Sequence, residues 1–181
     1  MANVAIVLEK GFEETEAVVP FDVLRRCHIG VRFVSTHSAS VASAQGLIIL
    51  TDMVDSLDNF DAIILPGGLP GAANLATNQT VISAVQSFTT ANKPVGAICA
   101  SPALVLSKAG VLNGRRFTCY PGMQSHVSGG EYTEENVTVD GNIITSAGPA
   151  TALQFGLMVA RKLGVDPGDV AESLLWTRYN D

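Results

Sequence analysis

Short apolar runs alternate with amphipathic segments along this chain. Residues 4–8 form a continuous apolar run, which is typical of a strand buried on both faces of a sheet. Apolar positions then recur at helical spacing over residues 13–27, and Gly30 stands where such a helix commonly ends. A second strand is predicted at residues 31–34. Strands and helices that alternate in this way indicate a mostly parallel sheet covered by helices on both faces.

The same alternation continues to the end of the chain. Further strands are predicted at residues 47–50, 62–65, 95–98 and 117–119, and further helices at residues 81–91, 151–163 and 170–176. Residues 137–145 have the pattern of a β-hairpin with an Asp-Gly turn. No internal repeat, linker or low-complexity stretch interrupts the pattern. We therefore expect a single α/β domain over residues 1–181, a length that allows a good-sized core.

Composition and charge narrow the classes of function. Hydrophobic residues make up 47% of the chain, charged residues make up 15%, and the formal net charge is −6. Nucleic acids and anionic membranes need basic surfaces, so neither is expected as a partner. No basic segment followed by an apolar stretch opens the chain, and no apolar run reaches the ~18 residues that span a bilayer. These features predict a cytoplasmic protein.

The cysteines and histidines lack the spacing of a metal site, so no metal is expected. An odd number of cysteines fits free thiols in a reducing compartment better than a disulfide framework. The three cysteines are Cys27, Cys99 and Cys119. The three histidines, for which surface or helix-capping positions are expected, are His28, His37 and His126.

Cys99 is the residue most indicative of chemistry. It follows the apolar strand predicted to end at Ile98 and precedes a helix predicted to begin at Ala100, so it lies on a sharp strand-to-helix turn. The unpaired amides and the positive end of the helix dipole favour an anion there. We therefore expect the thiol to ionise more easily than a free cysteine and to act as a nucleophile, like the serine of a nucleophile elbow. A buried structural cysteine is the alternative that this segment leaves open.

Other loops are predicted to meet Cys99, because the carboxyl ends of parallel strands share one edge of a sheet. These loops are residues 11–16, 66–68 and 146–149. The Gly67-Gly68 pair allows a close approach of the backbone, and its amides and that of Ala100 can form an oxyanion-type pocket. A plain turn is the alternative. The sequence after Gly68 lacks the Gly-Lys-Ser/Thr ending of a phosphate loop.

An acidic cluster begins the first predicted helix. Glu13 and Glu14 suit the helix dipole and need no further role. Glu16 lies further along, beside apolar residues, and its pKa is expected to rise if it turns into the crevice. A protonated Glu16 can donate a hydrogen bond to the Cys99 thiolate or carry protons for a reaction.

Several of these motifs, taken together, resemble those of a known family. They are residues 11–17, 65–68, 97–100, 120–122 and 145–149, and they cover nearly the whole chain. In this order they resemble the ThiJ/PfpI superfamily, on its parkinsonism-associated (DJ-1-like) branch. The resemblance implies a flavodoxin-like three-layer α/β sandwich and a homodimer. It also places the reactive nucleophile at Cys99, its partner carboxylate at Glu16 and the oxyanion-type amides at Gly67, Gly68 and Ala100.

The sequence departs from the family pattern at three positions. Some members carry a histidine directly after the cysteine, where this chain has Ala100, and this argues against a Cys-His hydrolase. Others have a histidine where this chain has Tyr120, whose phenol can donate a proton but is a poor base at neutral pH. Some relatives have an arginine where this chain has Ala147, so a charge that holds an anion near the cysteine is missing.

The resemblance implies a substrate class, and the residues imply the chemistry. The first hypothesis is a cofactor-free glyoxalase or deglycase, in which Cys99 adds to methylglyoxal, glyoxal or their adducts and Glu16 carries the proton. The second is a redox sensor or chaperone-like stress protein whose Cys99 is oxidised to a sulfinate without turnover. The third is a binding module with an inert cysteine. Four residues are candidates for the pocket wall: Phe12, Tyr120, Pro149 and Leu153. A dimer is expected to use the first helix, and if Asp22 or Arg26 lies at that interface, the partner subunit can complete the pocket.

Overall fold

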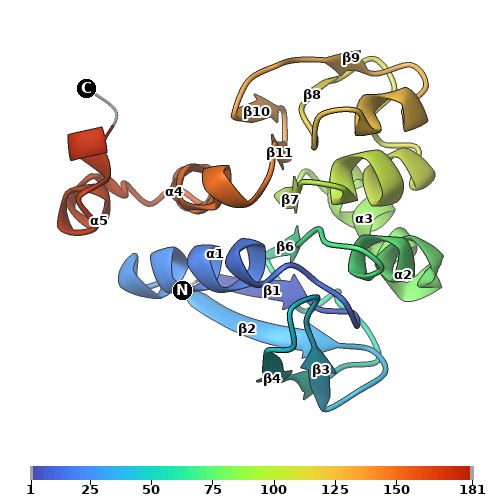
Figure 1. Ribbon diagram of the computed structural model, residues 1–181, viewed down its shortest axis with the longest axis horizontal. Coiled ribbons are helices and arrows are strands. Elements are labelled where there is room, and N and C mark those ends of the chain that lie inside the picture. The colour runs from blue at the N-terminus through green and yellow to red at the C-terminus, as the bar shows by residue number, and fades with distance from the viewer. Residues whose placement is uncertain (1, 180–181) are drawn as a thin grey trace.

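A seven-stranded sheet forms the centre of the computed structural model, which describes residues 2–179 (Figure 1). Its strand order is β10-β11-β7-β6-β1-β2-β5. In chain order the strands are β1 (Asn3–Val7), β2 (Gly30–Ser35), β5 (Asp52–Met53), β6 (Ala62–Leu65), β7 (Val95–Ile98), β10 (Val137–Asp140) and β11 (Ile143–Ser146). All neighbours pair in parallel except β10 and β11, which form the predicted antiparallel hairpin.

Helices cover both faces of this sheet, as the alternating pattern predicts (Figure 1). One layer contains α1 (Glu14–Arg26), α4 (Ala152–Lys162) and α5 (Gly168–Ser173), with α1 packed along α4. The other layer contains α2 (Gly71–Thr77), α3 (Gln79–Thr90) and a helical segment whose middle, Pro102–Leu106, is π-helical. The fold is therefore a flavodoxin-like three-layer α/β sandwich. None of the described helices is long and apolar enough to cross a bilayer.

Two hydrophobic clusters, one on each face, explain why the first strand is apolar throughout. In β1, Val4 and Ile6 pack into the cluster under α1 and α4. Ala5 and Val7 point the other way, into the cluster under α3. Side chains alternate across a strand, so a strand buried on both faces is apolar at every position.

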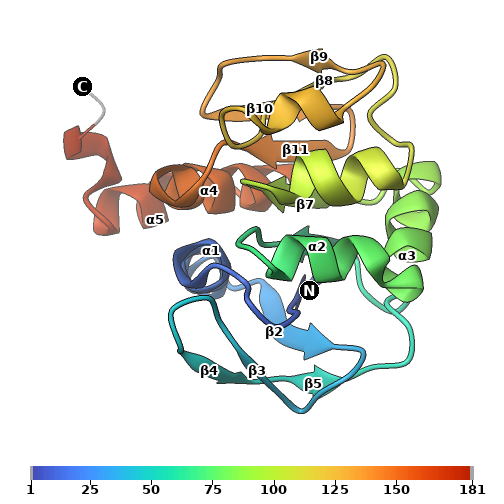
Figure 2. The same cartoon turned by 45° about the vertical axis from the view of Figure 1, so that its right-hand side comes forward.

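Two predicted strands are placed outside the central sheet. The run at residues 47–50 becomes β4 (Ile48–Leu50), which pairs with β3 (Ser40–Ala42) in a separate hairpin. The run at residues 117–119 becomes β8 (Arg116–Phe117), which pairs with β9 (Glu131–Tyr132). These two small sheets lie at opposite ends of the molecule (Figure 2). Local pattern identifies a strand but not its partner, so the sequence did not place them.

Three further short helical turns lie at Met123–His126, Pro149–Thr151 and Trp176–Tyr179 of the described chain. The direction of connection along the sheet reverses at β1, which has β2 on one side and β6 on the other. Open α/β sheets bind ligands at the carboxyl ends of the strands that flank such a reversal. The loops after β1, β6 and β7 meet there, and they carry Glu16, Gly67-Gly68 and Cys99.

Candidate active site

Cys99 lies directly after β7 on the predicted strand-to-helix turn. Its backbone has φ of +62°, a left-handed conformation that is uncommon for a residue other than glycine. Its N–H donates to the carbonyl of Ser146 at 2.9 Å, and its own carbonyl accepts from the N–H of Tyr120 at 2.8 Å. These two hydrogen bonds fix the strained turn between β11 and the loop after β8. A non-glycine residue with positive φ that the surroundings hold in place is typical of functional sites.

Glu16 is fully buried in the first turn of α1 and lies against the Cys99 thiol. Its Oε2 accepts the N–H of Gly67 at 2.7 Å, whereas Oε1 has no hydrogen-bond partner among the described residues. Burial raises the pKa of this carboxyl to about 7, although the hydrogen bond from Gly67 works in the opposite direction. Glu16 therefore points inward, the condition under which its pKa was expected to rise.

Gly67 packs closely against both Cys99 and Glu16, with no room for a side chain. A Cβ at this position would lie 2.7 Å from Cys99 Cβ and 2.7 Å from Glu16 Oε2. The prediction that its amide belongs to the oxyanion group is wrong, because that N–H donates to Glu16 instead. The amides of Gly68 and Ala100 face the Cys99 side chain and lower the pKa of its thiol, and their role as oxyanion donors stays a prediction. Two N–H groups therefore face the sulfur, and a third holds the carboxylate beside it.

The expectation that the Cys99 thiol ionises easily is wrong for the free site. Burial raises its pKa to about 12, and the charge and hydrogen bond of Glu16 raise it further than the Gly68 and Ala100 amides lower it. The helix end was the feature visible in the sequence, whereas the opposing carboxylate depends on the fold. The consequence is that an ionised Glu16 lies beside a thiol that keeps its proton, and the thiolate forms only as that proton passes to Glu16.

Ser101 is a positioning residue that the sequence did not single out. It is fully buried, and its hydroxyl donates to the carbonyl of Pro66 at 2.6 Å. This bond ties the helical segment after Cys99 to the loop that carries Gly67 and Gly68. The sequence signal that could have identified Ser101 is its place two residues after the proposed nucleophile.

A pocket of ≈ 290 Å³ opens onto the sulfur. Its lining residues are Gly68, Leu69, Cys99, Ala100, Tyr120 and Met123. A second pocket of ≈ 210 Å³ shares Tyr120 and is lined also by Pro121, Ala147, Gly148, Pro149, Ala150 and Thr151. Tyr120 and Pro149 are thus wall residues, as predicted, and Leu69 and Met123 were missed because only the fold brings their loops to Cys99.

Two predicted wall residues lie elsewhere. Phe12 is fully buried in the core, and Leu153 packs against the same cluster on the α4 side. The loop between β1 and α1 turns the Phe12 ring inward, so the prediction of Phe12 as a wall residue is wrong. The carbonyl of Phe12 accepts from the N–H of Ala44 at 2.8 Å, which ties this loop to the β3–β4 hairpin.

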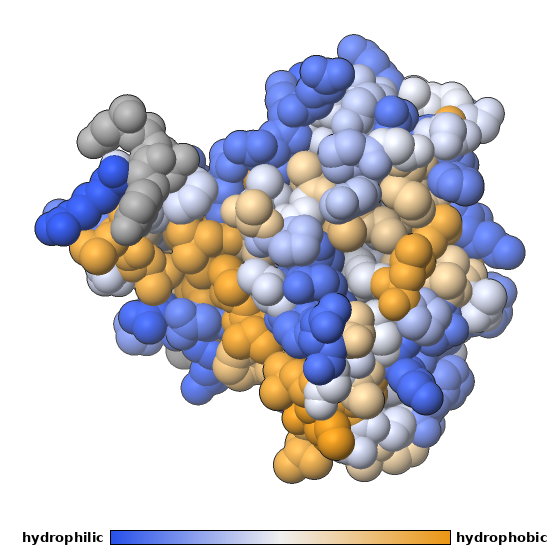
Figure 3. Space-filling model, in the orientation of Figure 1, coloured by the Kyte–Doolittle hydropathy of each residue, from blue (hydrophilic) through white to orange (hydrophobic). Residues whose placement is uncertain are grey.

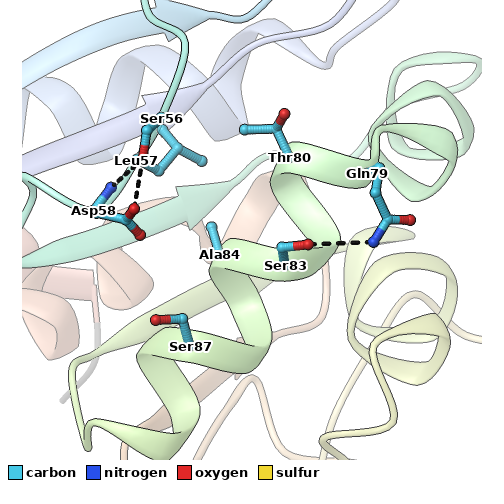
Figure 4. Close-up of a pocket in the computed structure, with 8 residues that line it drawn as sticks. All are labelled: Ser56, Leu57, Asp58, Gln79, Thr80, Ser83, Ala84 and Ser87. Atoms are coloured by element: carbon cyan, nitrogen blue, oxygen red, sulfur yellow. Dashed lines mark hydrogen bonds between the residues drawn. The ribbon is translucent and has the colours of Figure 1, made fainter.

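Other features of the molecule lie apart from Cys99. Figure 4 shows a pocket of ≈ 340 Å³ between α3 and the loop before β6. It is lined by Ser56, Leu57, Asp58, Gln79, Thr80, Ser83, Ala84 and Ser87, and so holds no thiol. Within residues 2–179, no group of three or more histidine, cysteine, aspartate or glutamate side chains could hold a metal ion. The side chains of His28, His37 and His126 are exposed, as expected.

The raised pKa of Glu16 predicts a pH-dependent stability. The native carboxyl retains its proton up to about pH 7, whereas the unfolded one loses it near 4.5, so wild-type stability falls as the pH rises through that range. Glu16→Gln removes this ionisation. We expect its unfolding free energy, relative to wild type, to grow by roughly 2–3 kcal/mol between pH 5 and pH 8. Urea titrations at the two pH values measure the difference.

Glu14→Gln is the matched control, with the opposite sign. Burial raises the pKa of Glu14, but hydrogen bonds from the Ser43 hydroxyl and the Gln45 amide outweigh it and lower the pKa overall. A lowered native pKa adds stability that is already almost fully present above pH 4.5, so the unfolding free energy of Glu14→Gln, relative to wild type, should fall only slightly between pH 5 and pH 8. An equal response of the two variants to pH would contradict the assignment to Glu16.

The fold and the site together define a class of protein: a flavodoxin-like α/β sandwich with a cysteine on a strand-to-helix turn against a buried carboxyl. Known proteins place the chain more closely. The DJ-1/PfpI family matches residues 2–162, and the chain belongs to that family.

Three relatives illustrate the likeness. Protein DJ-1 homolog B of Arabidopsis thaliana is 37% identical over 164 residues; the match covers 88% of this chain, which spans 37% of that protein's length. The crystal structure of Drosophila melanogaster DJ-1beta has a TM-score of 0.90 at 35% identity, covering 97% of this chain and 98% of that one. A Caenorhabditis elegans protein named glutathione-independent glyoxalase DJR-1.2 is 33% identical over 156 residues, covering 83% of this chain and 82% of that protein.

Proposed function

We propose that this protein is a cofactor-free, cysteine-dependent glyoxalase or deglycase that acts on methylglyoxal, glyoxal or their adducts. The observation that carries the proposal is the contact between the Cys99 thiol and the buried Glu16 carboxyl, with the Gly68 and Ala100 amides facing the same sulfur. This arrangement supplies a nucleophile, a proton carrier and donors for developing charge. The name of the Caenorhabditis elegans relative supports the substrate class.

The first step forms a covalent adduct. The Cys99 sulfur attacks the aldehyde carbon of methylglyoxal, and a carbon–sulfur bond forms as the carbonyl π bond opens. Glu16 takes the thiol proton, because its carboxylate lies against the thiol and has a pKa of about 7. The proton passes to the former aldehyde oxygen and gives a hemithioacetal. The Gly68 and Ala100 N–H groups, which face the sulfur, stabilise the oxygen charge that develops beside it.

The second step moves a proton between two carbons. Glu16 removes the proton of the carbon bonded to sulfur, and an enediolate forms with its charge on the former ketone oxygen, which then takes the neighbouring hydroxyl proton. Return of the proton to the neighbouring carbon gives a thioester of a hydroxy acid. Water then cleaves the thioester, which releases lactate and restores the thiol. The sum is methylglyoxal plus water to lactate plus a proton, so neither glutathione nor a redox cofactor is consumed.

The ionisation of Glu16 predicts how the rate of the reaction depends on pH. Between about pH 7 and pH 12 the pair holds one proton, and this is the form in which Glu16 can accept the thiol proton. We expect kcat/KM for methylglyoxal without glutathione to rise with pH through an apparent pKa near 7. Glu16→Gln should lose this rise and fall ~10²–10⁴-fold in kcat, the range for a lost proton-transfer group. A Glu16→Gln variant that keeps wild-type kcat and the same profile would contradict the proposal.

A redox sensor that uses the same residues is the second candidate. Glu16 with a pKa of about 7 can stay protonated near neutral pH. Its Oε1, which has no partner among the described residues, can then donate a hydrogen bond to a sulfinate at Cys99. Peroxide would oxidise the sulfur by two oxygen atoms without turnover. Intact-protein mass after peroxide treatment, compared with Cys99→Ser, tests this candidate.

We also propose a homodimer, formed through α1 and the β3–β4 hairpin. Ile48 is 67% exposed and Leu50 is 81% exposed, and Figure 3 shows hydrophobic side chains gathered over this hairpin. Glu14 binds the hairpin at Ser43, so Val18, one turn further along α1 and also exposed, continues the apolar surface. A monomer seldom leaves such an edge strand uncovered.

The dimer is tested by sedimentation equilibrium. We expect wild type to have twice the chain mass and the double variant Ile48→Glu/Leu50→Glu to have the mass of one chain. Val139→Glu, an exposed apolar residue on β10, is the matched control and should stay dimeric. The expected place of Asp22 and Arg26 in the interface stays a prediction; in the chain they form an ion pair of 2.8 Å on α1. A monomeric wild type would contradict the proposal.

A further inference from the structure

The two pockets beside Cys99 form one uncharged surface. The six residues that line the pocket at the sulfur include no charged side chain, and neither do the seven that line its neighbour. Large apolar groups stand at the mouth, where Leu69 is 61% exposed and Tyr120 is 51% exposed. Exposed side chains of this size, gathered around a reactive group, indicate a surface that a ligand covers.

Tyr120 connects the two pockets. Its N–H bonds the carbonyl of Cys99 at 2.8 Å, which fixes it beside the sulfur. Its ring lies over Gly148, where an added Cβ would lie 3.4 Å from Tyr120 Cδ2. A group that leaves the Cys99 pocket past this ring therefore enters the second pocket of ≈ 210 Å³.

The second pocket offers apolar contact rather than hydrogen bonds from its side chains. Its one hydroxyl besides that of Tyr120 belongs to Thr151 and is already engaged with Ser146 at 2.6 Å and with Gly148 at 2.8 Å. The remaining wall is made of alanine, glycine and proline. A polar or charged group placed there would lose its hydration without replacement.

Charge works against anions at the same site. The carboxyl that acts on Cys99 is that of Glu16, and the formal net charge of the chain is −6. The amides of Gly68 and Ala100 are directed at the sulfur and are thus committed to the reacting atoms. An anionic substituent would therefore lie against an uncharged wall and feel the repulsion of the buried Glu16 carboxylate behind Cys99.

We propose that the site selects α-keto aldehydes whose second substituent is neutral and apolar, that this substituent lies along Tyr120 in the second pocket, and that anionic analogues are rejected. The inference rests on the proposed function, because it names the substrate class of that reaction. Phenylglyoxal, whose substituent is a phenyl ring, is the probe that fills the second pocket, and glyoxal, whose substituent is a hydrogen, is the probe that leaves it empty.

The first test compares kcat/KM for phenylglyoxal and glyoxal in wild type and Tyr120→Ser. Taking the ratio of the two substrates within each protein, and then between proteins, removes their intrinsic reactivities. We expect Tyr120→Ser to lower the phenylglyoxal-to-glyoxal ratio ~10-fold or more, mainly through KM, the scale of a lost apolar contact. Val139→Thr, an exposed apolar position on β10, is the control that should leave the ratio unchanged. An unchanged ratio in Tyr120→Ser would overturn the proposal.

The second test does not depend on turnover. Cys99 is alkylated with iodoacetamide, N-phenyl iodoacetamide or iodoacetate, in each case by displacement of iodide, and the rates are divided by those of free glutathione. We expect the phenyl reagent to react fastest and iodoacetate to be at least ~10-fold slower than iodoacetamide. Leu69→Arg, which adds a cation at the mouth, should raise the iodoacetate rate selectively. Equal normalised rates in wild type would overturn the proposal.

The two tests separate the inference from the function on which it rests. If no dicarbonyl is turned over but the alkylation rates keep the expected order, the proposed reaction fails and the apolar, anion-rejecting pocket stands. If glyoxal is turned over and both tests show no selectivity, the reaction stands and the substrate class is wrong.

Discussion

Cys99→Ser should abolish the turnover of methylglyoxal, with a fall in kcat on the order of 10⁴-fold or more, the scale on which losing a catalytic nucleophile is felt. A serine hydroxyl is a much weaker nucleophile than a thiol and holds its proton more firmly, so Glu16 cannot activate it to the same extent. The change is nearly isosteric, so the turn at φ of +62° and its hydrogen bonds to Ser146 and Tyr120 should persist. Initial rates without glutathione, with circular dichroism and a thermal melt as folding checks, measure the effect.

Cys27→Ala is the matched control for this loss. Cys27 is buried at the end of α1, and burial raises the pKa of its thiol, so it has no part in the proposed chemistry. We expect the Cys27→Ala variant to keep wild-type kcat. Residual dicarbonyl turnover in Cys99→Ser, at more than a few per cent of wild type, would show that another group carries the reaction.

Gly67→Ala removes no functional group, but we expect it to lower both kcat and the unfolding free energy. The new methyl group would lie 2.7 Å from Cys99 Cβ and 2.7 Å from Glu16 Oε2, and 2.9 Å from the carbonyl oxygen of Ile98. Thiol and carboxyl must move apart, and a displacement of about 1 Å in a reacting pair lowers the rate roughly 10²-fold. Overpacking of the crevice should lower the unfolding free energy by about 1–3 kcal/mol as well. Dicarbonyl kinetics and urea titration measure the two effects.

Gly168→Ala is the matched control, because it makes the same substitution at a glycine that has room for a methyl group. Gly168 begins α5, and an added Cβ would lie at an ordinary 3.5 Å from Asp166 Oδ1. Neither glycine has the left-handed backbone that would itself disfavour alanine. The Gly168→Ala variant should therefore keep wild-type kcat and stability. A Gly67→Ala variant with unchanged kcat would contradict the close contact of thiol, glycine and carboxyl.

The sequence predicts the elements of this fold better than their partners. The apolar run of β1 and the Asp-Gly hairpin of β10 and β11 are local signals, and both are confirmed. The run at residues 47–50 is also a strand, but its partner β3 (Ser40–Ala42) is only three residues long and too short to give a clear strand pattern. Helix α2 was not predicted, because Gly71–Thr77 is short and its helical conformation depends on packing against the segment after Cys99.

The same limit explains which parts of the site were found. Cys99 and Glu16 were identified because each stands at a strand or helix boundary with a chemistry of its own. The thiol pKa was predicted in the wrong direction, because the helix end is visible in the sequence and the burial beside Glu16 is not. Gly67 was given the wrong role for a similar reason: its N–H points at a carboxylate that lies 51 positions away in the chain.

The measurement that tests the account most directly is the amount of lactate formed per Cys99 from methylglyoxal without glutathione, followed together with the mass of the protein. The account predicts many equivalents of lactate per chain, an unmodified Cys99 at the end of the reaction, and none of this product from Cys99→Ser. No lactate from wild type, together with a gain of two oxygen atoms confined to Cys99 under peroxide, would contradict the account and leave Cys99 as a sensor rather than a catalyst.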